Sequence, residues 1–283
     1  MESPKFFGTE VFMKKFLALA LALVMLLSAT FVMASCDKEE DVLVCGVTIF
    51  ENMNEQDENG NWTGFESEFA MAVGEIIDMK VEFQIIDWSQ KYSELTAGKI
   101  DCIWNGFTAN ASEEDANGNL VKRSDLVDFS YSYMLNQQCV VVRKDKLSNY
   151  TSEESLVGKT AAVEGGSAGA TYAKKAVGEN GKLNEFSAQN ATFMEVKGGK
   201  SDFAVVDILL AQNICGKGDF ADLTIVDSIE LDAEYYAIGF KKGSDLTAKV
   251  NAAIKELEEN GTLKTLAKKY GFENVLKVSE SFE

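Results

Sequence analysis

The sequence predicts an α/β fold of two doubly wound lobes, and three observations favour this class. Short apolar runs typical of buried strands alternate with helix-spaced apolar residues from residue 42 onwards. The alternation starts again near residue 138, and 283 residues are enough for two ordinary domains. The only proline, Pro4, precedes this region, so any hinge between the lobes must be built from crossing strands rather than a proline-rich linker.

The N-terminus has the layout of a secretory signal. Residues 14–36 contain two lysines, a long apolar run and small residues before Cys36. A retained transmembrane anchor is the alternative, because the apolar run nears the length of a membrane span. Ala34-Ser35-Cys36 resembles the end of a bacterial lipoprotein signal, whose cysteine becomes the lipid-bearing first residue. We therefore expect a signal peptide over 1–35, with 1–12 as a candidate misassigned start before Met13, and a lipidated tether over 36–41.

Charge and composition exclude several function classes. The net charge is −18, and removing residues 1–35, with three lysines and two glutamates, leaves −19. Such an acidic chain argues against nucleic acid or anionic lipid as a ligand. The absence of histidine makes a zinc site or a histidine-based triad unexpected, and we expect no cofactor. Two states stay open for the remaining cysteines, buried thiols or at least one disulfide: Cys45, Cys102, Cys139 and Cys215.

The first lobe is predicted from a regular order of elements. A buried strand is expected over 42–50, and a helix begins at Phe65, where apolar residues recur at helical spacing. A second strand over 80–88 and a short helix over 92–97 follow. A short strand over 102–104 completes a β-α-β-α-β unit, which predicts a mainly parallel sheet.

A second unit follows a polar stretch, residues 109–122, which is predicted to be an exposed loop. From residue 138 the chain predicts a strand, then a strand, a glycine-rich turn and a helix, and then a strand that runs into another helix. These elements are expected over 138–144, 159–176 and 202–211. A last strand over 234–243 precedes a helical pattern over 245–270, which is interrupted at Asn260-Gly261.

The loop after the strand Cys102 to Trp104 is the first candidate for a binding site. The apolar run stops at Asn105-Gly106, and ligands of α/β proteins bind beyond the carboxyl ends of strands, where glycine lets the backbone approach them. Arg123 follows, and its planar guanidinium is suited to holding a carboxylate through two parallel hydrogen bonds. The alternative is that Arg123 is a solvated surface arginine.

The order of these motifs resembles the amino-acid-binding solute receptors that feed ABC importers, which have the type II periplasmic-binding-protein fold. The resemblance covers nearly all of residues 42–272 and implies a ligand cleft between two lobes joined by two crossing strands. It implies a first lobe of 42–132 and 237–283, a second lobe of 138–231, and hinge strands at 133–137 and 232–236. The stretches that carry it are WTGFESEFA, IDCIWNGFT, VDFSYSY, VEGGSAG, GGKSDFAVVD and NGTLKTLAKKYG.

A family member of this kind must bury a zwitterion, which is costly unless fixed partners answer both charges. For the α-carboxylate the resemblance implies Arg123, the hydroxyl and amide of Thr108, and the amides of Ser167 and Ala168 at a helix start. For the ammonium group it implies Asp207 and the Gly106 carbonyl. Ser167 and Asp207 are alternatively helix caps.

The resemblance also implies aromatic walls at Phe50 and Trp88, which are alternatively ordinary core aromatics. Trp104 is expected to face the core. Glu51 and Glu164 are further candidates for specificity, and Glu164 either meets a donor or cation of the ligand or is solvated. The segment between Thr108 and Arg123 is longer than the family usually has, which leaves the rim of the cleft open.

We therefore predict a monomeric, lipid-anchored receptor, at the outer face of the cell membrane or in the periplasm. It binds an amino acid or close derivative by hinge closure, delivers it to a membrane permease, and is not an enzyme. An enzyme on the same scaffold, such as a dehydratase, is the alternative, although it would need a carboxyl group with a strongly raised pKa. A sensor module of a signalling protein is disfavoured, because no kinase-like region follows.

Overall fold

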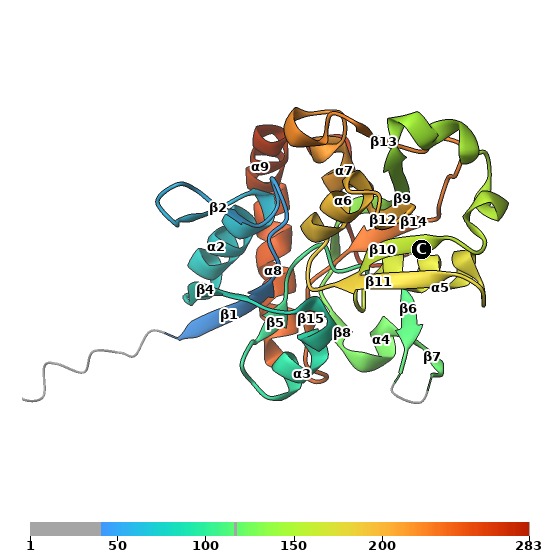
Figure 1. Ribbon diagram of the computed structural model, residues 1–283. Helices are drawn as coiled ribbons and strands as arrows, with labels where there is room; N and C mark the ends of the chain where they lie inside the picture. The colour runs from blue at the N-terminus through green and yellow to red at the C-terminus, as the bar shows by residue number, and fades with distance from the viewer. Residues whose placement is uncertain (1–40, 116–117, 283) are drawn as a thin grey trace, which may run out of the picture. The chain divides into compact units, whose positions relative to one another are not determined.

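The computed structural model describes residues 41–115 and 118–282, and this part of the chain contains two main β-sheets with helices on their faces (Figure 1). The signal segment and Cys36 lie outside the described residues. None of the described helices is long and apolar enough to cross a membrane.

The first sheet has the strand order β4-β1-β5-β15-β8. Its three parallel strands are β1 (Val42–Val47), β4 (Lys80–Ile85) and β5 (Cys102–Ile103). Strand β15 (Gly239–Phe240), from near the end of the chain, pairs antiparallel with β5 and with β8 (Asp128–Phe129). The first sheet is therefore complete only when distant parts of the chain meet.

The second sheet repeats this pattern, with the order β11-β10-β12-β9-β13. Strands β10 (Thr160–Glu164), β11 (Lys182–Phe186) and β12 (Phe203–Asp207) are parallel. Strands β9 (Ser132–Arg143) and β13 (Leu223–Ile225) continue the sheet antiparallel to β12 and to each other. The two sheets thus share one order of parallel strands, and the predicted class of two doubly wound α/β lobes is confirmed.

The twelve-residue strand β9 links the two sheets. Its second half pairs with β12 and β13, whereas residues 134–137 of its first half pair with β14 (Ala233–Tyr236). Strand β16 (Leu276–Ser279) also pairs with the first half of β9. The chain therefore passes from the first sheet to the second through β9 and returns to the first sheet after β14.

Helices cover both faces of each sheet. In β12, the alternate residues Phe203 and Val205 pack with α5 (Ala168–Val177). Their neighbours Ala204 and Val206 face the opposite side, because successive side chains of a strand alternate. That side is covered by α6 (Asn190–Lys197) and α7 (Ile208–Ile214). Around the first sheet lie α2 (Phe65–Ile77), α3 (Lys91–Thr96), α8 (Asp245–Glu259) and α9 (Thr262–Tyr270).

The remaining elements are short. They are the hairpins β2 (Glu55–Gln56) with β3 (Trp62–Thr63) and β6 (Ser112–Glu114) with β7 (Leu120–Lys122), the helix α4 (Arg123–Leu126), and the 3-10 turns η1 (Trp88–Gln90), η2 (Lys144–Asn149), η3 (Glu153–Leu156) and η4 (Gly218–Phe220).

Five sequence predictions need correction. The stretch 109–122, predicted to be an exposed loop, contains the β6–β7 hairpin. The strands predicted over 42–50 and 80–88 end at Val47 and Ile85, and the strand that starts at Ser132 was predicted only from residue 138. The strand predicted over 234–243 is two strands, β14 and β15, because the chain changes sheet between them.

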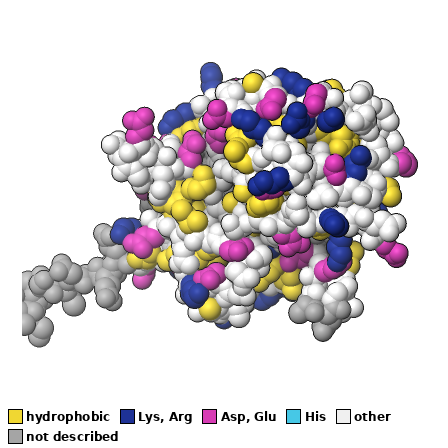
Figure 2. Space-filling view, in the orientation of Figure 1, with side chains coloured by type: hydrophobic (Ala, Val, Ile, Leu, Met, Phe, Trp, Pro, Cys, Tyr) yellow, Lys and Arg dark blue, Asp and Glu magenta, His cyan; other side chains and the backbone are white. Residues whose placement is uncertain are grey.

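Charged side chains of both signs are interspersed with apolar ones on the face seen in Figure 2.

The cysteines of the described chain, Cys45, Cys102, Cys139 and Cys215, are free thiols. Cys45 and Cys102 face each other on neighbouring strands with their sulfur atoms 3.6 Å apart. The buried-thiol alternative therefore holds for Cys45, Cys102 and Cys139, whereas Cys215 is a free thiol that is only partly buried.

Candidate functional site

Side chains and loops from both lobes enclose a small space, which we call the inner chamber. Eight predicted residues line it: Trp88, Gly106, Thr108, Arg123, Glu164, Ser167, Ala168 and Asp207. Asn105, Gln138 and Gln189 complete the lining. The chamber has a volume of about 10 Å³, roughly the minimum that holds one water molecule. An amino acid therefore does not fit in the chamber with the lobes in this arrangement.

Gly106, in the loop after β5, brings backbone rather than a side chain to the chamber. Gly106 has φ of +55°, and a Cβ at this position would lie 3.0 Å from the ring of Tyr236 and 3.3 Å from that of Phe50. Its amide donates to Oε1 of Glu66 at 2.8 Å. The fully buried Glu66 also accepts from Asn54 and from the Tyr133 hydroxyl. Glycine is needed here because both the backbone angle and the packing exclude a side chain.

Arg123 is 1% exposed, so it is not a solvated surface arginine. Its Nε donates to Glu113 at 2.9 Å, Nη1 to the Thr108 carbonyl at 3.2 Å, and Nη2 to the Gly166 carbonyl at 3.2 Å. The guanidinium also lies 4.9 Å from the ring centre of Phe107. Since Gly166 belongs to the second lobe, Arg123 contacts both lobes.

Asp207 ends β12 and is the centre of a buried polar cluster. Its Oδ1 accepts from Asn136 Nδ2 at 2.6 Å and from Gln138 Nε2 at 2.7 Å. The same two amide nitrogens donate to Oε2 of Glu234, at 2.7 and 3.0 Å. The Gln189 amide holds the other oxygen of Asp207, and Gln189 Oε1 accepts from the Asp207 amide at 2.9 Å.

This cluster decides against a capping role for Asp207. Among the described residues, the Asp207 side chain makes no capping hydrogen bond at the start of α7. Burial raises the pKa of Asp207, against the lowering effect of the hydrogen bond from Gln189. Burial and then the charge of Asp207 raise the pKa of Glu234 to about 7. A cation placed between these carboxyl groups would favour their ionised forms.

Glu164 ends β10 and is 3% exposed. Its Oε1 is buried and has no hydrogen-bond partner among the described residues. Burial and then the charge of Asp207 raise the pKa of Glu164 to about 8, while the charge of Lys91 opposes this shift. The solvated alternative is therefore wrong, and Glu164 offers a free acceptor to the chamber.

The start of α5 serves the site through its backbone. The hydroxyl of Ser167 caps the helix by accepting from the Ala170 amide at 3.0 Å, and the Ser167 amide donates to the Glu164 carbonyl at 3.2 Å. Ala168 is the first residue of α5, so its amide has no partner within the helix. The side chain of Ser167 is thus a helix cap, as the alternative predicted. The amide of Ala168 is the better candidate for binding an anion.

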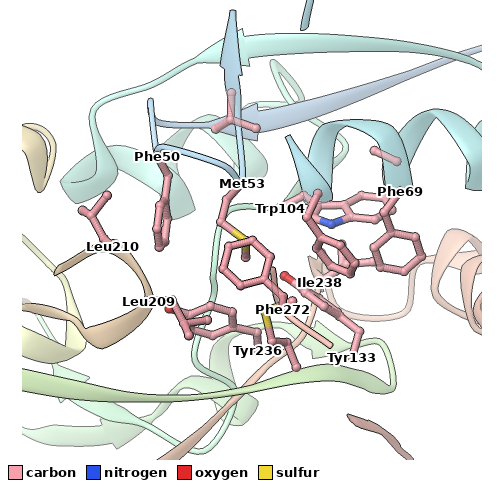
Figure 3. Close-up of a cluster of buried hydrophobic side chains, with 14 of the residues drawn as sticks. Phe50, Met53, Phe69, Trp104, Tyr133, Leu209, Leu210, Tyr236, Ile238 and Phe272 are labelled. Carbon is pink, nitrogen blue, oxygen red and sulfur yellow. The ribbon is translucent and has the colours of Figure 1, made fainter. Parts of the chain in front are cut away.

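The aromatic residues divide between core and chamber. Trp88 lines the chamber, with Lys91 Nζ 5.3 Å from its ring centre. Phe50 does not line it and packs instead in the main core cluster. Trp104 also faces the core, in the cluster of buried side chains that contains Phe69 (Figure 3). The two rings meet edge to face, with their centres 5.0 Å apart. Glu51 is exposed in a turn.

A wider hollow, which we call the outer groove, lies next to the inner chamber. Its volume is about 590 Å³, and its lining shares Thr108, Gln138 and Ala168 with the chamber. Glu234 lies in the wall of the outer groove, whereas Asp207 lies in that of the chamber. The two spaces are therefore separated by only a thin wall of side chains.

Several residues of the site escaped the sequence analysis. Lys91 is 1% exposed, donates to the Gly166 carbonyl at 2.9 Å, and has a pKa lowered to about 8 by burial and by the charge of Arg123. Asn136 and Gln138 are separated by Gln137, where the predicted hinge strand 133–137 meets the strand predicted from residue 138, so no alternation with apolar residues marked them. Glu113 had no signal either, because its stretch was interpreted as a loop.

The chain matches the bacterial extracellular solute-binding proteins, family 3, over residues 43–274. It is 27% identical over 266 residues to the "Arginine-binding extracellular protein ArtP" of Bacillus subtilis, covering 91% of this chain and 98% of that protein. It is 31% identical over 269 residues to the "Probable amino-acid-binding protein YxeM" of the same organism, covering 93% and 97%.

Solved structures show the same likeness. A mutant of ArgBP from T. maritima has a TM-score of 0.72 at 30% identity, covering 83% of this chain and 96% of that one. An ancestral arginine-binding protein bound to arginine also has a TM-score of 0.72, at 31% identity, covering 81% and 97%. The ancestral amino acid-binding protein AncCDT-1, a precursor of cyclohexadienyl dehydratase, has a TM-score of 0.69 at 26% identity, covering 81% and 95%.

Proposed function

This chain belongs to the bacterial extracellular solute-binding proteins, family 3, and binds an amino acid, and we propose that its ligand has a cationic side chain and is delivered to an ABC permease. The family is extracellular, and the relatives are mostly named as binding proteins. The finer assignments below rest on the geometry of the inner chamber.

The observation that carries the ligand class is the charge of the chamber. Among the described residues that line it, the charged ones are Arg123, Glu164 and Asp207. A cationic amino acid carries one carboxylate and two cations, so each of its charges has an opposite partner. We assign Arg123 to the α-carboxylate, Asp207 to the ammonium group and Glu164 to the side-chain cation. Relatives and structures named for arginine support this choice.

Binding requires the lobes to open and close, since the inner chamber is too small for an amino acid to enter. We propose that strands β9 and β14 bend at 133–137 and 232–236. Three contacts join the lobes and must break to admit the ligand: Arg123 and Lys91 to the Gly166 carbonyl, and Asn190 to the Ile49 carbonyl at 3.2 Å. A ligand whose charged groups pair with charged residues of both lobes would shift this two-state equilibrium toward the closed form.

The anchor is a proposal from the sequence. A lipid on Cys36 would hold the receptor at the outer face of the membrane, near its permease, as a monomer. Membrane-extracted protein should then begin with a diacylglyceryl cysteine at Cys36 when its intact mass is measured. An unmodified Cys36 or an uncleaved signal would contradict the anchor without affecting the binding function.

Titration calorimetry against a panel of amino acids tests the ligand class. We expect saturable binding of L-arginine or L-lysine, with weaker binding of L-glutamine, L-histidine and L-cystine. Tightest binding of a neutral amino acid would contradict the assignment of Glu164. Mass spectrometry after long incubation should recover the ligand unchanged.

A specific observation also keeps the enzyme alternative open. Because the pKa of Glu164 is raised to about 8, this carboxyl group holds a proton at neutral pH and could act as a general acid. One structural neighbour is described as a precursor of a dehydratase. Loss of water from a bound ligand in the same incubation, abolished by Glu164→Gln, would favour the enzyme over the receptor.

A further inference from the structure

The β6–β7 hairpin lies between Thr108 and Arg123 in the sequence and projects from the body of the fold next to α4 and α5 (Figure 1). The amide of Arg123 donates to the Ala111 carbonyl at 3.1 Å, so the base of the hairpin is tied to the residue that follows it. Successive side chains of a strand point to opposite sides. In β6, Glu113 therefore points inward and Glu114 outward, with side chains 12% and 44% exposed.

Glu113 meets two buried cations through one oxygen. Its Oε2 lies 2.9 Å from Arg123 Nε and 3.5 Å from Lys91 Nζ, and each cationic side chain is 1% exposed. Without this carboxylate, two like charges would face each other with little solvent around them, which is costly. The charge of Arg123 already lowers the pKa of Lys91, and the charge of Glu113 opposes that effect.

The contact leaves part of Arg123 available. A guanidinium has five N–H groups, and three of those of Arg123 are used by Glu113, Thr108 and Gly166 within the described part of the chain. The two that remain belong to the terminal nitrogens. A carboxylate that competed with the ligand would pair with the guanidinium through both of its oxygens. From the guanidinium group of Arg123, Glu113 instead accepts only the hydrogen bond of Nε. This bond fixes the orientation of the guanidinium group through its Nε edge.

We propose that Glu113 is a positioning residue, which orients the guanidinium of Arg123 for the ligand's α-carboxylate without touching the ligand itself. This inference rests on the proposed function, because it presupposes that Arg123 binds that carboxylate. The hairpin thereby becomes a part of the binding site rather than a surface insertion. Glu114, which pairs with Lys174 of α5 at 2.5 Å, provides a matched control on the same strand.

The first test compares L-arginine with agmatine, the amine that remains when its carboxylate is removed. Glu113→Gln should weaken L-arginine about 10- to 100-fold, as loss of an outer-shell partner does at metal sites. Agmatine should bind the variant much as it binds the wild type, and Glu114→Gln should change neither affinity. Glu113→Asp should restore part of the loss. Equal losses for both compounds, no loss, or tighter binding of L-arginine would overturn the proposal.

The second test needs no ligand. The sequence contains two arginines, Arg123 and Arg143, so a nitrogen-15 spectrum of arginine Nε–H groups has two signals, and Arg123→Ala assigns them. The Arg123 signal should exchange slowly with water in the wild type and in Glu114→Gln, and quickly in Glu113→Gln. Slow exchange in Glu113→Gln would overturn the positioning role even if L-arginine is not the ligand.

The Arg123→Ala variant distinguishes a failure of the role proposed for Arg123 from a failure of the role proposed for Glu113. If it leaves the affinity for L-arginine unchanged, the assignment of Arg123 under the proposed function fails. If it weakens L-arginine while Glu113→Gln does not, only the role of Glu113 fails.

Discussion

At the scale of single residues, Asp207 serves the fold and the site with the same carboxylate. Its two oxygens accept from the side chains of Asn136 and Gln138 in β9 and of Gln189 before α6, which are two different segments of the chain. These bonds fix the carboxylate where the chamber is lined, and they stabilise a negative charge that burial opposes. An asparagine at position 207 would turn its NH₂ group, a hydrogen-bond donor, toward these donor side chains.

Asp207→Asn should therefore weaken an α-amino acid strongly, by roughly 2–5 kcal/mol, because the ligand's ammonium group loses its buried partner. The des-amino analogue of L-arginine, 5-guanidinopentanoic acid, should lose much less. Titration calorimetry with both compounds measures the difference. Equal losses for the two would show that Asp207 acts only by holding the structure, and the thermal midpoint of the ligand-free variant reports that contribution.

Glu164→Gln should reduce the preference for L-arginine over its neutral isostere L-citrulline by about 1.5–3 kcal/mol, the value of a hydrogen bond to a charged group. In the wild type the carboxyl group is largely protonated at pH 7, since its pKa is raised to about 8. A bound cation favours the ionised form, so binding should release a proton. Calorimetry in two buffers of different ionisation enthalpy counts that proton, and an unchanged count in the variant would argue against this role.

At the scale of elements, the loop after β5 depends on a glycine. Gly106→Ala meets both a positive φ and the rings of Tyr236 and Phe50, whereas Gly98→Ala meets a φ of +71° with open space around it. Each strained backbone costs of order 1–3 kcal/mol. We expect Gly106→Ala to be the more destabilising in denaturant unfolding and to weaken ligand binding. Equal destabilisation would mean that the rings of Tyr236 and Phe50 move aside.

The elements also show where prediction from sequence stops. Strands such as β1 and β12 were found because their side chains are almost continuously buried, so the apolar runs stand out. The β6–β7 hairpin was missed because only Leu120 and Val121 of its six strand residues are apolar and none of the six is buried. Arg123 and Asp207 could be found from local motifs, but Glu113, Gln189 and Glu234 act through partners on other elements. No local pattern records such pairs.

At the scale of the whole molecule, buried acids tie stability to pH. Burial raises the pKa of Glu66 to about 7, of Glu164 to about 8 and of Glu234 to about 7, from an ordinary value of 4.5. Acids whose pKa is raised on folding stabilise the fold while protonated. This stability is fully present below pH 4.5 and is lost as the pH rises through 7 to 8.

The thermal midpoint of the ligand-free protein should therefore fall between pH 5 and pH 8.5, with Glu164→Gln flattening the upper part of the curve. Scanning calorimetry over this range measures it. A saturating cationic amino acid should reduce the fall of the thermal midpoint with pH, because its positive charges pair with the carboxylates that form. A midpoint that rises across the same range would contradict the assignment of these groups as buried acids.

Strand β15 has a consequence for how the protein is made. The five strands on the main path of the second sheet, β11-β10-β12-β9-β13, lie between residues 132 and 225, so this part of the sheet can assemble before β14 and β16 are synthesised. The first sheet lacks its connection between β5 and β8 until residues 239 and 240 have emerged from the ribosome. Helices α8 and α9, which pack on α2, are made later still. The lobe that starts first in the sequence is thus the last to fold, and its exposed apolar strands must be kept from aggregating until the C-terminus arrives.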